Sequence, residues 1–214
     1  MKNATKHADD LRSLFKRLLK EHKPAPLEKQ EPLKALVRAA MSSNVSDGKA
    51  TEAMKHIEKE FVDLNELRVA TDLEIAELLG VRYPDITHRV EVITKSLNAI
   101  FEKEHTLNLD RLATLSKRDA RQFLKDLTPA EPMHPFVEAY VMLYSFDGHA
   151  VPVDEEILAY LREEEIFDEK TSVVDAQKFL EHHVKAEECH DFFHTVRHAA
   201  HSEVERGRRK GKAK

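Results

Sequence analysis

The stretch from Leu127 to Tyr160 decides the fold, because it sets an unusual turn and an acidic helix start between two helices. It reads L-T-P-A-E-P-M-H-P-F-V-E-A-Y-V-M-L-Y-S-F-D-G-H-A-V-P-V-D-E-E-I-L-A-Y. The prolines at positions 129, 132 and 135 cannot continue a helix, so the chain must turn before the apolar run from Phe136 resumes helical spacing. A second break follows at Asp147-Gly148, and V-P-V-D-E-E-I-L then places Asp154 at the start of a new helix.

The rest of the chain predicts helices and no strands. Leu11, Leu14 and Leu18 recur at helical spacing within residues 8–22, and most other segments show a similar apolar stripe. Helix starts are also recognisable, for example T-D-L-E over residues 71–74, which is a capping box. Because no alternating pattern appears, we predict an all-α protein of short helices.

Composition is that of a soluble protein with one or two compact domains. The chain has 214 residues, of which 41% are apolar. It has no apolar run long enough to span a membrane, and its first twenty residues are rich in charge, so we expect a cytoplasmic protein without membrane contact. Its single cysteine, Cys189, excludes an internal disulfide and a four-cysteine metal site.

Charge is distributed unevenly along the chain. The net charge is −5, yet residues 1–38 hold ten basic against five acidic residues, and residues 206–214 hold six basic and no acidic ones. Residues 39–205 therefore carry the acidic excess. Since phosphate neutralisation supplies most non-specific DNA affinity, any duplex contact must come from the ends or from a local basic patch.

Two patches resemble the helix-hairpin-helix DNA glycosylases, endonuclease III in particular. A-V-P-V-D-E-E at residues 150–156 resembles the family's I-A-V-D-T-H, whose aspartate is catalytic, and Asp154 is the matching position. Upstream, L-V-R-A-A-M-S-S-N-V-S-D at residues 36–47 resembles a helix that ends in L-L-S-A-Q-A-T-D. Asn44 then stands where the family places a glutamine that fills the space left by an extruded base.

The chain also departs from the family's pattern. The family hairpin reads L-P-G-V-G-x-K-T-A, whereas residues 127–139 contain no glycine, and glycine lets backbone N–H groups approach a phosphate closely. Phe136 stands at or near the position of the lysine that bifunctional members use to form a Schiff base, and phenylalanine cannot do that chemistry. The four cysteines of the family's iron-sulfur cluster are missing, so we expect no such cofactor.

The resemblance implies a two-lobed fold, with a six-helix barrel over residues 25–148 and a second helical lobe from residues 1–24 and 149–205. We expect residues 206–214 to form a basic, disordered tail. Residues implied to face DNA are Asn44, Pro129, Met133, His134 and Phe136, together with the tail residues Arg208, Arg209 and Lys210.

Asp154 has two interpretations. An aspartate before E-E-I-L is a good N-cap, and acidic residues at a helix start complement its dipole. In glycosylase chemistry the same carboxylate stabilises positive charge on the sugar. Asn44 likewise fits either a base-replacing residue or an ordinary polar turn.

Histidines raise a rival hypothesis. His190, His194, His198 and His201 follow one helical face, with His182-His183 nearby, and histidines four residues apart can chelate zinc or nickel. No H-E-x-x-H motif is present, and a solvated polar face explains the stripe equally well, so we predict no metal site.

Two function classes remain open. The first is a monofunctional base-excision-repair glycosylase that uses Asp154. The second is a catalytically silent relative that binds DNA or a protein partner through the same fold. For either class we expect a monomer whose binding to duplex DNA is weak and independent of sequence.

Overall fold

The structure, a computed structural model, describes the backbone of residues 4–80, 82–127 and 134–212, with side chains over 6–80, 82–127 and 134–204. Within these ranges it contains eleven α-helices and two 3-10 helices and no strand, which confirms the all-α prediction. None of the described helices combines the length and the apolar content that crossing a bilayer requires.

The chain divides into two compact units, which we name by their place in the sequence. The central unit is residues 29–148, and the terminal unit is residues 1–28 and 149–214. The sequence analysis places these boundaries after residues 24 and 148.

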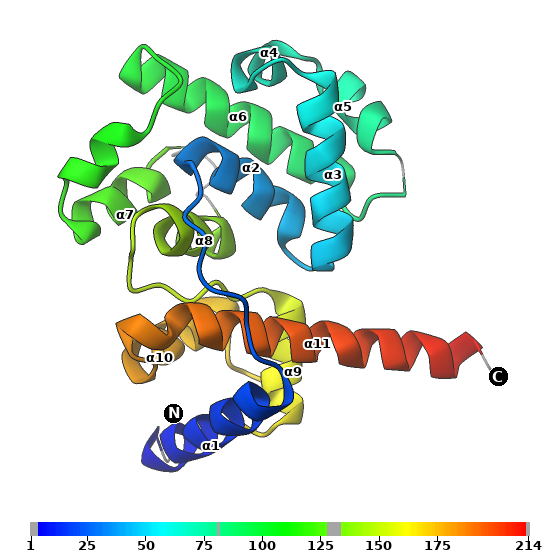
Figure 1. Cartoon of the computed structure of the whole chain (residues 1–214), viewed down its shortest axis with the longest axis vertical. Coiled ribbons are helices and arrows are strands. Elements are labelled where there is room, and N and C mark those ends of the chain that lie inside the picture. Colours follow the sequence, from blue (N-terminus) through cyan, green and yellow to red (C-terminus); the bar gives the residue numbers. More distant parts are fainter. Residues whose placement is uncertain (1–3, 81, 128–133, 213–214) are drawn as a thin grey trace. The chain divides into compact units, whose positions relative to one another are not determined.

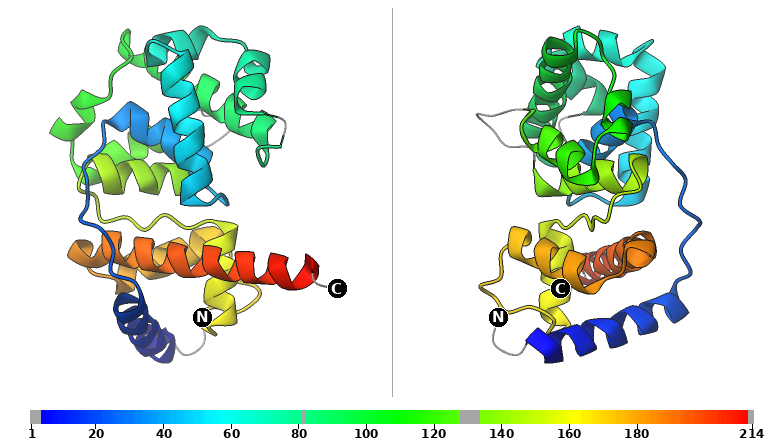
Figure 2. Two further views of the ribbon diagram at one scale, coloured as in Figure 1. Left: turned by 45° about the vertical axis from the view of Figure 1, so that its right-hand side comes forward. Right: turned by 90° about the vertical axis from the view of Figure 1, so that its left-hand side faces the viewer.

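The central unit is a set of helices around α2 and α8. In Figures 1 and 2, α2 lies between α6 and α8, and it also packs against α3; α4 and α5 pack on α6, and α7 packs on α8. Residues 136–145 of α8 are all buried, so this helix forms the middle of the core. The helices are α2 (Pro32–Ser42), α3 (Asp47–Glu60), α4 (Leu64–Val69), α5 (Asp72–Leu79), α6 (Ile86–Glu104), η1 (Asp110–Thr114), α7 (Lys117–Lys125) and α8 (Pro135–Ser145).

Side-chain caps fix where several of these helices begin. The predicted capping box before α5 is confirmed, because the hydroxyl of Thr71 accepts from the backbone N–H of Glu74 while the Glu74 carboxylate accepts from the backbone N–H of Thr71. Gly80 ends α5 at φ 83°, a backbone conformation that favours glycine.

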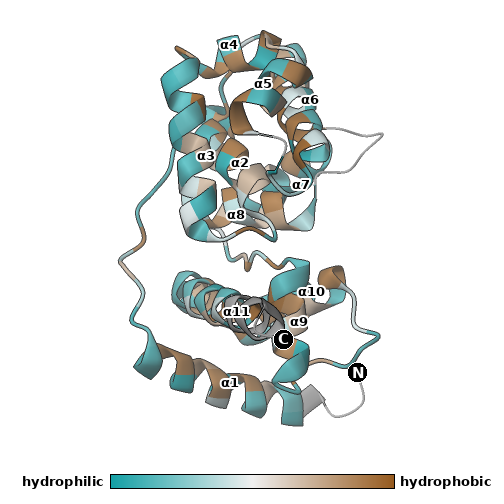
Figure 3. Cartoon of the chain, turned by 90° about the vertical axis from the view of Figure 1, so that its right-hand side faces the viewer, coloured by the Kyte–Doolittle hydropathy of each residue, from teal (hydrophilic) through white to brown (hydrophobic). Residues whose placement is uncertain are grey.

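The terminal unit joins the first helix to the last four helical segments. They are α1 (Ala4–Glu21), α9 (Glu155–Glu163), α10 (Val173–His183), η2 (Ala186–Glu188) and α11 (Cys189–Lys212). Here α11 packs against α1 and α9, and α10 packs against α9. The ribbon of α1 alternates between brown and teal in Figure 3, which is the amphipathic pattern that its leucines predict.

The end of α11 lies in the stretch where the sequence predicts a basic tail. The backbone of the helix continues to Lys212, so the structure describes residues 206–212 as helix. Arginine and lysine are good helix formers, and extending an existing helix avoids the cost of nucleation, which a search for an apolar stripe does not detect.

Candidate functional site

Asp154 lies at the N-cap of α9, at the end of a buried loop formed by residues 150–153. Its Oδ1 accepts a hydrogen bond of 2.9 Å from the backbone N–H of Ile157, and its side chain is 1% exposed. Glu155 and Glu156 follow in the first turn, where negative charge is favourable. The predicted cap is therefore confirmed, and the carboxylate is held in one position inside the terminal unit.

The start of α9 is also tied to α11. Nδ1 of His201 lies 2.8 Å from Oε2 of Glu156, and both side chains are largely buried. This contact joins the helix that Asp154 caps to the longest helix of the terminal unit. It therefore supports the position of the Asp154 carboxylate, two residues before Glu156.

The histidines separate into pairs. The ring of His198 stacks on that of His22, the residue just after α1, with centroids 3.9 Å apart and planes at 1°, while His190 contacts Asp191 and packs beside His194. Because a metal lies in the plane of a ligating imidazole, two parallel stacked rings are not arranged to share one ion. Among the described residues, no group of three or more His, Cys, Asp or Glu side chains could hold a metal ion.

Asn44 occupies the turn between α2 and α3 and is half-buried. Its φ is 54°, in the left-handed region that asparagine tolerates better than most residues. The turn is held from α6, where the buried guanidinium of Arg89 donates 2.5 Å hydrogen bonds to the carbonyl oxygens of Ala40 and Ser43. The hydroxyl of Tyr83 donates to the carbonyl of Met41 at 2.8 Å. The last carbonyls of α2 are thus satisfied, and Asn44 is presented on a rigid turn.

Arg89 was not among the predicted site residues, although the sequence contains a signal for it. It shares a helix face with Ile93 and Leu97, four and eight residues later, and a lone arginine on an apolar face indicates a buried cation with a specific partner.

The hairpin between α7 and α8 is described only in part. Pro129 and Met133 lie outside the described residues. His134 is exposed and caps α8, since its Nδ1 accepts from the backbone N–H of Phe136 at 3.2 Å. Phe136 is 0% exposed and packs near the ring of Tyr140, with centroids 6.1 Å apart. The ring of Phe136 therefore faces the core of the central unit and is not exposed for the DNA contact that the resemblance implies.

A buried ion pair clamps the two hairpin helices together. Nε of Arg121 in α7 lies 2.5 Å from Oε1 of Glu138 in α8, and Glu138 is 1% exposed. At the other end of the pair of helices, the ammonium of Lys117 donates to the carbonyl oxygen of Phe146. The sequence analysis missed this clamp, although a glutamate inside the apolar run of residues 136–144 is a signal for a buried charge.

The candidate residues are thus divided between the two units. Asn44, His134 and Phe136 belong to the central unit, whereas Asp154 belongs to the terminal unit. Arg208, Arg209 and Lys210 lie in the last turns of α11, where the structure describes the backbone alone.

Comparison with known proteins gives a likeness in structure only, since no family model and no curated protein matches this sequence. An 8-oxoguanine glycosylase/lyase from Clostridium acetobutylicum, solved with double-stranded DNA, matches with a TM-score of 0.69 at 16% identity, covering 93% of this chain and 70% of that one. Endonuclease III in a trapped covalent complex with DNA matches with a TM-score of 0.67 at 14% identity, covering 88% and 84%.

The 3-methyladenine DNA glycosylase of H. pylori, solved with 1,N6-ethenoadenine, matches with a TM-score of 0.63 at 14% identity, covering 94% of this chain and 98% of that one. This chain resembles each of the three proteins over most of its length. The protein therefore has the helix-hairpin-helix fold of these DNA glycosylases.

Proposed function

We propose that the protein is a monofunctional DNA glycosylase of base excision repair, in which Asp154 is the catalytic carboxylate. The observation that carries this proposal is the buried aspartate at the N-cap of α9, at the end of the loop that follows α8, in a chain with a glycosylase fold. The neighbours of this fold were solved with DNA or with a modified base, which supports duplex DNA as the partner.

In the proposed reaction the base leaves with the electron pair of the glycosidic bond, and positive charge develops on the sugar. The Asp154 carboxylate stabilises that charge and accepts a proton from the water that forms the new bond to C1′. The hydrogen bond from the Ile157 N–H and the Glu156–His201 contact fix the start of α9, so the carboxylate needs little reorganisation. The target base must first leave the duplex, and Asn44 on its rigid turn is the candidate to fill the space.

A lyase step is not part of the proposal. It needs an amine that attacks C1′, and residues 127–141 contain no lysine; the nearest, Lys125, ends α7 before the hairpin. Borohydride should therefore trap no covalent complex between the protein and abasic DNA. A trapped complex would show that another lysine reaches the sugar.

The test of the proposed activity is a panel of duplexes with uracil, oxidised pyrimidines, alkylated purines and mismatches, assayed for free base. We expect slow release of free base, and only from the more weakly paired lesions. The glycine-free hairpin should bind a DNA phosphate less tightly, so less binding energy offsets the cost of unstacking the base. No release from any duplex would favour the second candidate, a silent relative that binds DNA or a protein. That candidate is supported by the same absence of glycine over residues 127–139.

A further inference from the structure

The outer face of α7 is basic in a chain that is otherwise mostly acidic. Arg118, Gln122 and Lys125 stand four and three residues apart, which places them on one helical face, and all three are exposed. At 1.5 Å per residue, the seven residue steps from Arg118 to Lys125 span about 10 Å, or about three nucleotide steps of one DNA strand.

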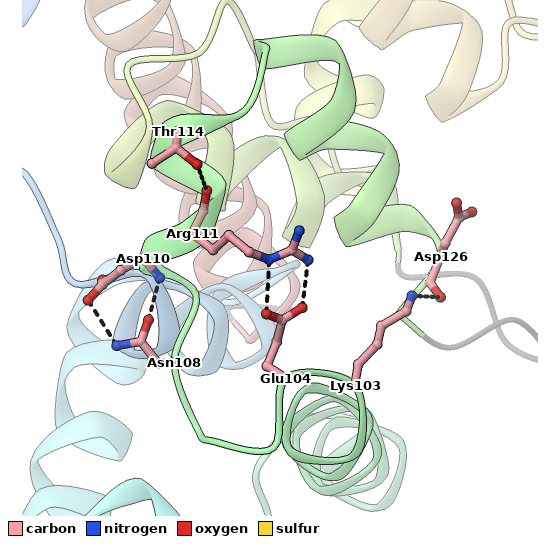
Figure 4. Close-up of polar contacts among 7 residues, drawn as sticks. All are labelled: Lys103, Glu104, Asn108, Asp110, Arg111, Thr114 and Asp126. Atoms are coloured by element: carbon pink, nitrogen blue, oxygen red, sulfur yellow. Dashed lines mark hydrogen bonds and ion pairs between the residues drawn. The ribbon is translucent and has the colours of Figure 1, made fainter.

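A third cation is fixed beside this face. The ammonium of Lys103, near the end of α6, donates a 3.2 Å hydrogen bond to the carbonyl oxygen of Asp126, just after α7 (Figure 4). The same ammonium lies 4.8 Å from the ring centroid of Phe123, and the guanidinium of Arg111 lies 5.2 Å from that centroid. Two cationic groups therefore lie near the ring of Phe123. Aromatic and basic side chains in such an arrangement are suited to binding nucleic acid.

Acidic groups near α7 are engaged with partners inside the protein. Glu104 accepts two hydrogen bonds from Arg111, at 2.7 and 3.0 Å (Figure 4), and this contact lowers the pKa of the carboxyl. Asp119 accepts from the hydroxyl of Ser116, and Asp126 accepts from the side chain of Gln122.

The two outer cations have no such engagement. Arg118 and Lys125 make no hydrogen bond or ion pair with another residue in the part of the chain that the structure describes. Two exposed cations on one helix face, beside a third that is held in place, form a surface that fits a row of phosphates.

We propose that Lys103, Arg118 and Lys125, with Gln122 between them, form a contact surface for the phosphate backbone of duplex DNA, here called the α7 patch. The inference rests on the proposed function. It adds the surface by which the protein holds its DNA substrate. Since α7 leads directly into the hairpin, the patch supplies phosphate contacts beside the segment that lacks glycine. It also gives the central unit a source of DNA affinity that does not depend on residues 206–214.

The test compares three full-length proteins: wild type, Arg118→Gln/Lys125→Gln, and the control Lys55→Gln/Lys59→Gln. The control removes the same charge from exposed positions of α3 in the same unit. Affinity for a short undamaged duplex is measured by fluorescence anisotropy at several salt concentrations. Thermal unfolding checks that the variants fold as the wild type does, and free-base release is measured on the best duplex of the lesion panel.

We expect the α7 variant to bind on the order of tenfold more weakly at low salt, with the slope of log K against log salt reduced by about 2. The control should keep the affinity and the slope of the wild type. Equal affinity and slope in the α7 variant and the control would overturn the patch while leaving the proposed activity intact. Wild-type protein that releases base from lesions yet binds undamaged duplex without any salt dependence would overturn it as well. If the wild type neither binds DNA nor releases free base, that result would contradict the proposed function and the α7 patch together.

Discussion

The guanidinium of Arg89 binds three carbonyl oxygens around the turn that carries Asn44, those of Ala40 and Ser43 and, through Nε at 2.7 Å, that of Pro84. Replacing Arg89 by methionine keeps much of the side-chain volume but leaves these buried acceptors without their donor. We expect the free energy of unfolding to fall by about 2 to 3 kcal/mol, measured by urea denaturation.

The matched control for this prediction is Arg82→Met, because Arg82 is exposed and precedes the same helix. Its free energy of unfolding should stay within about 0.5 kcal/mol of the wild type. Equal effects of the two substitutions would mean that Arg89 does not hold the turn.

Cys189 gives a prediction on alkaline stability. Burial, followed by the negative charge of Glu181, raises the pKa of this fully buried thiol from its ordinary value of 9.0 to about 12. Between these values the unfolded thiol ionises and the native thiol does not, so unfolding releases a proton and stability falls as pH rises above about 9.

The comparison is with Cys189→Ala, which lacks the thiol. Urea denaturation at pH 8 and pH 10.5 should show a larger loss of unfolding free energy for wild type than for the variant. Identical losses would show that the thiol ionises equally in both states. The raised pKa also makes Cys189 an unreactive thiol rather than a nucleophile.

At the level of elements, the end of α11 and the two residues that follow it hold six basic residues, between Arg206 and Lys214. Deleting residues 206–214 should flatten the salt dependence of DNA binding, because fewer phosphates are neutralised. Anisotropy titrations of the truncated and full-length proteins measure this. Binding that survives both the deletion and about 0.3 M salt would contradict a role for this end of the helix.

The histidines of α10 and α11 give a second prediction at this scale. Their rings pair with each other, with His22, with Asp191 and with Glu156, so we expect no structural metal. The melting temperature should be the same with and without a chelator, since a metal bound only to the native state would raise it. A large drop on chelation would establish a metal site.

Helix starts were the most predictable elements, because a cap is a contact between neighbours in sequence. Thr71 and Asp154 each accept a backbone N–H at the start of a predicted helix, and Ser116 and Ser172 do the same at the starts of α7 and α10. The clamp between Arg121 and Glu138 depends on two helices meeting in space, and no local pattern specifies that partner. Phe101 of α6 is a large apolar residue that local patterns favour inside, yet it is 38% exposed, with the guanidinium of Arg68 over its ring at 4.2 Å.

For the whole molecule, the sequence was enough for the all-α class and for the motif that ends in Asp154, because both depend on patterns within a short stretch. It was not enough for the location of positive charge. Counting residues left either the ends or a local basic patch as the source of DNA contacts, and the α7 patch proposed here gathers Lys103, Arg118 and Lys125 from positions up to 22 residues apart. The contacts that hold Asn44 are equally non-local, since Arg89 lies 45 residues later in the chain.

The central claim is that the Asp154 carboxylate does chemistry and is not only a cap. Asparagine caps helices about as well as aspartate, so Asp154→Asn should keep the melting temperature and the affinity for DNA while losing the charge. The most direct measurement is single-turnover release of free base by wild type and Asp154→Asn on the lesion that wild type excises best. We expect the variant to be at least about 100-fold slower. Release at the wild-type rate by a folded, DNA-binding Asp154→Asn protein would contradict it.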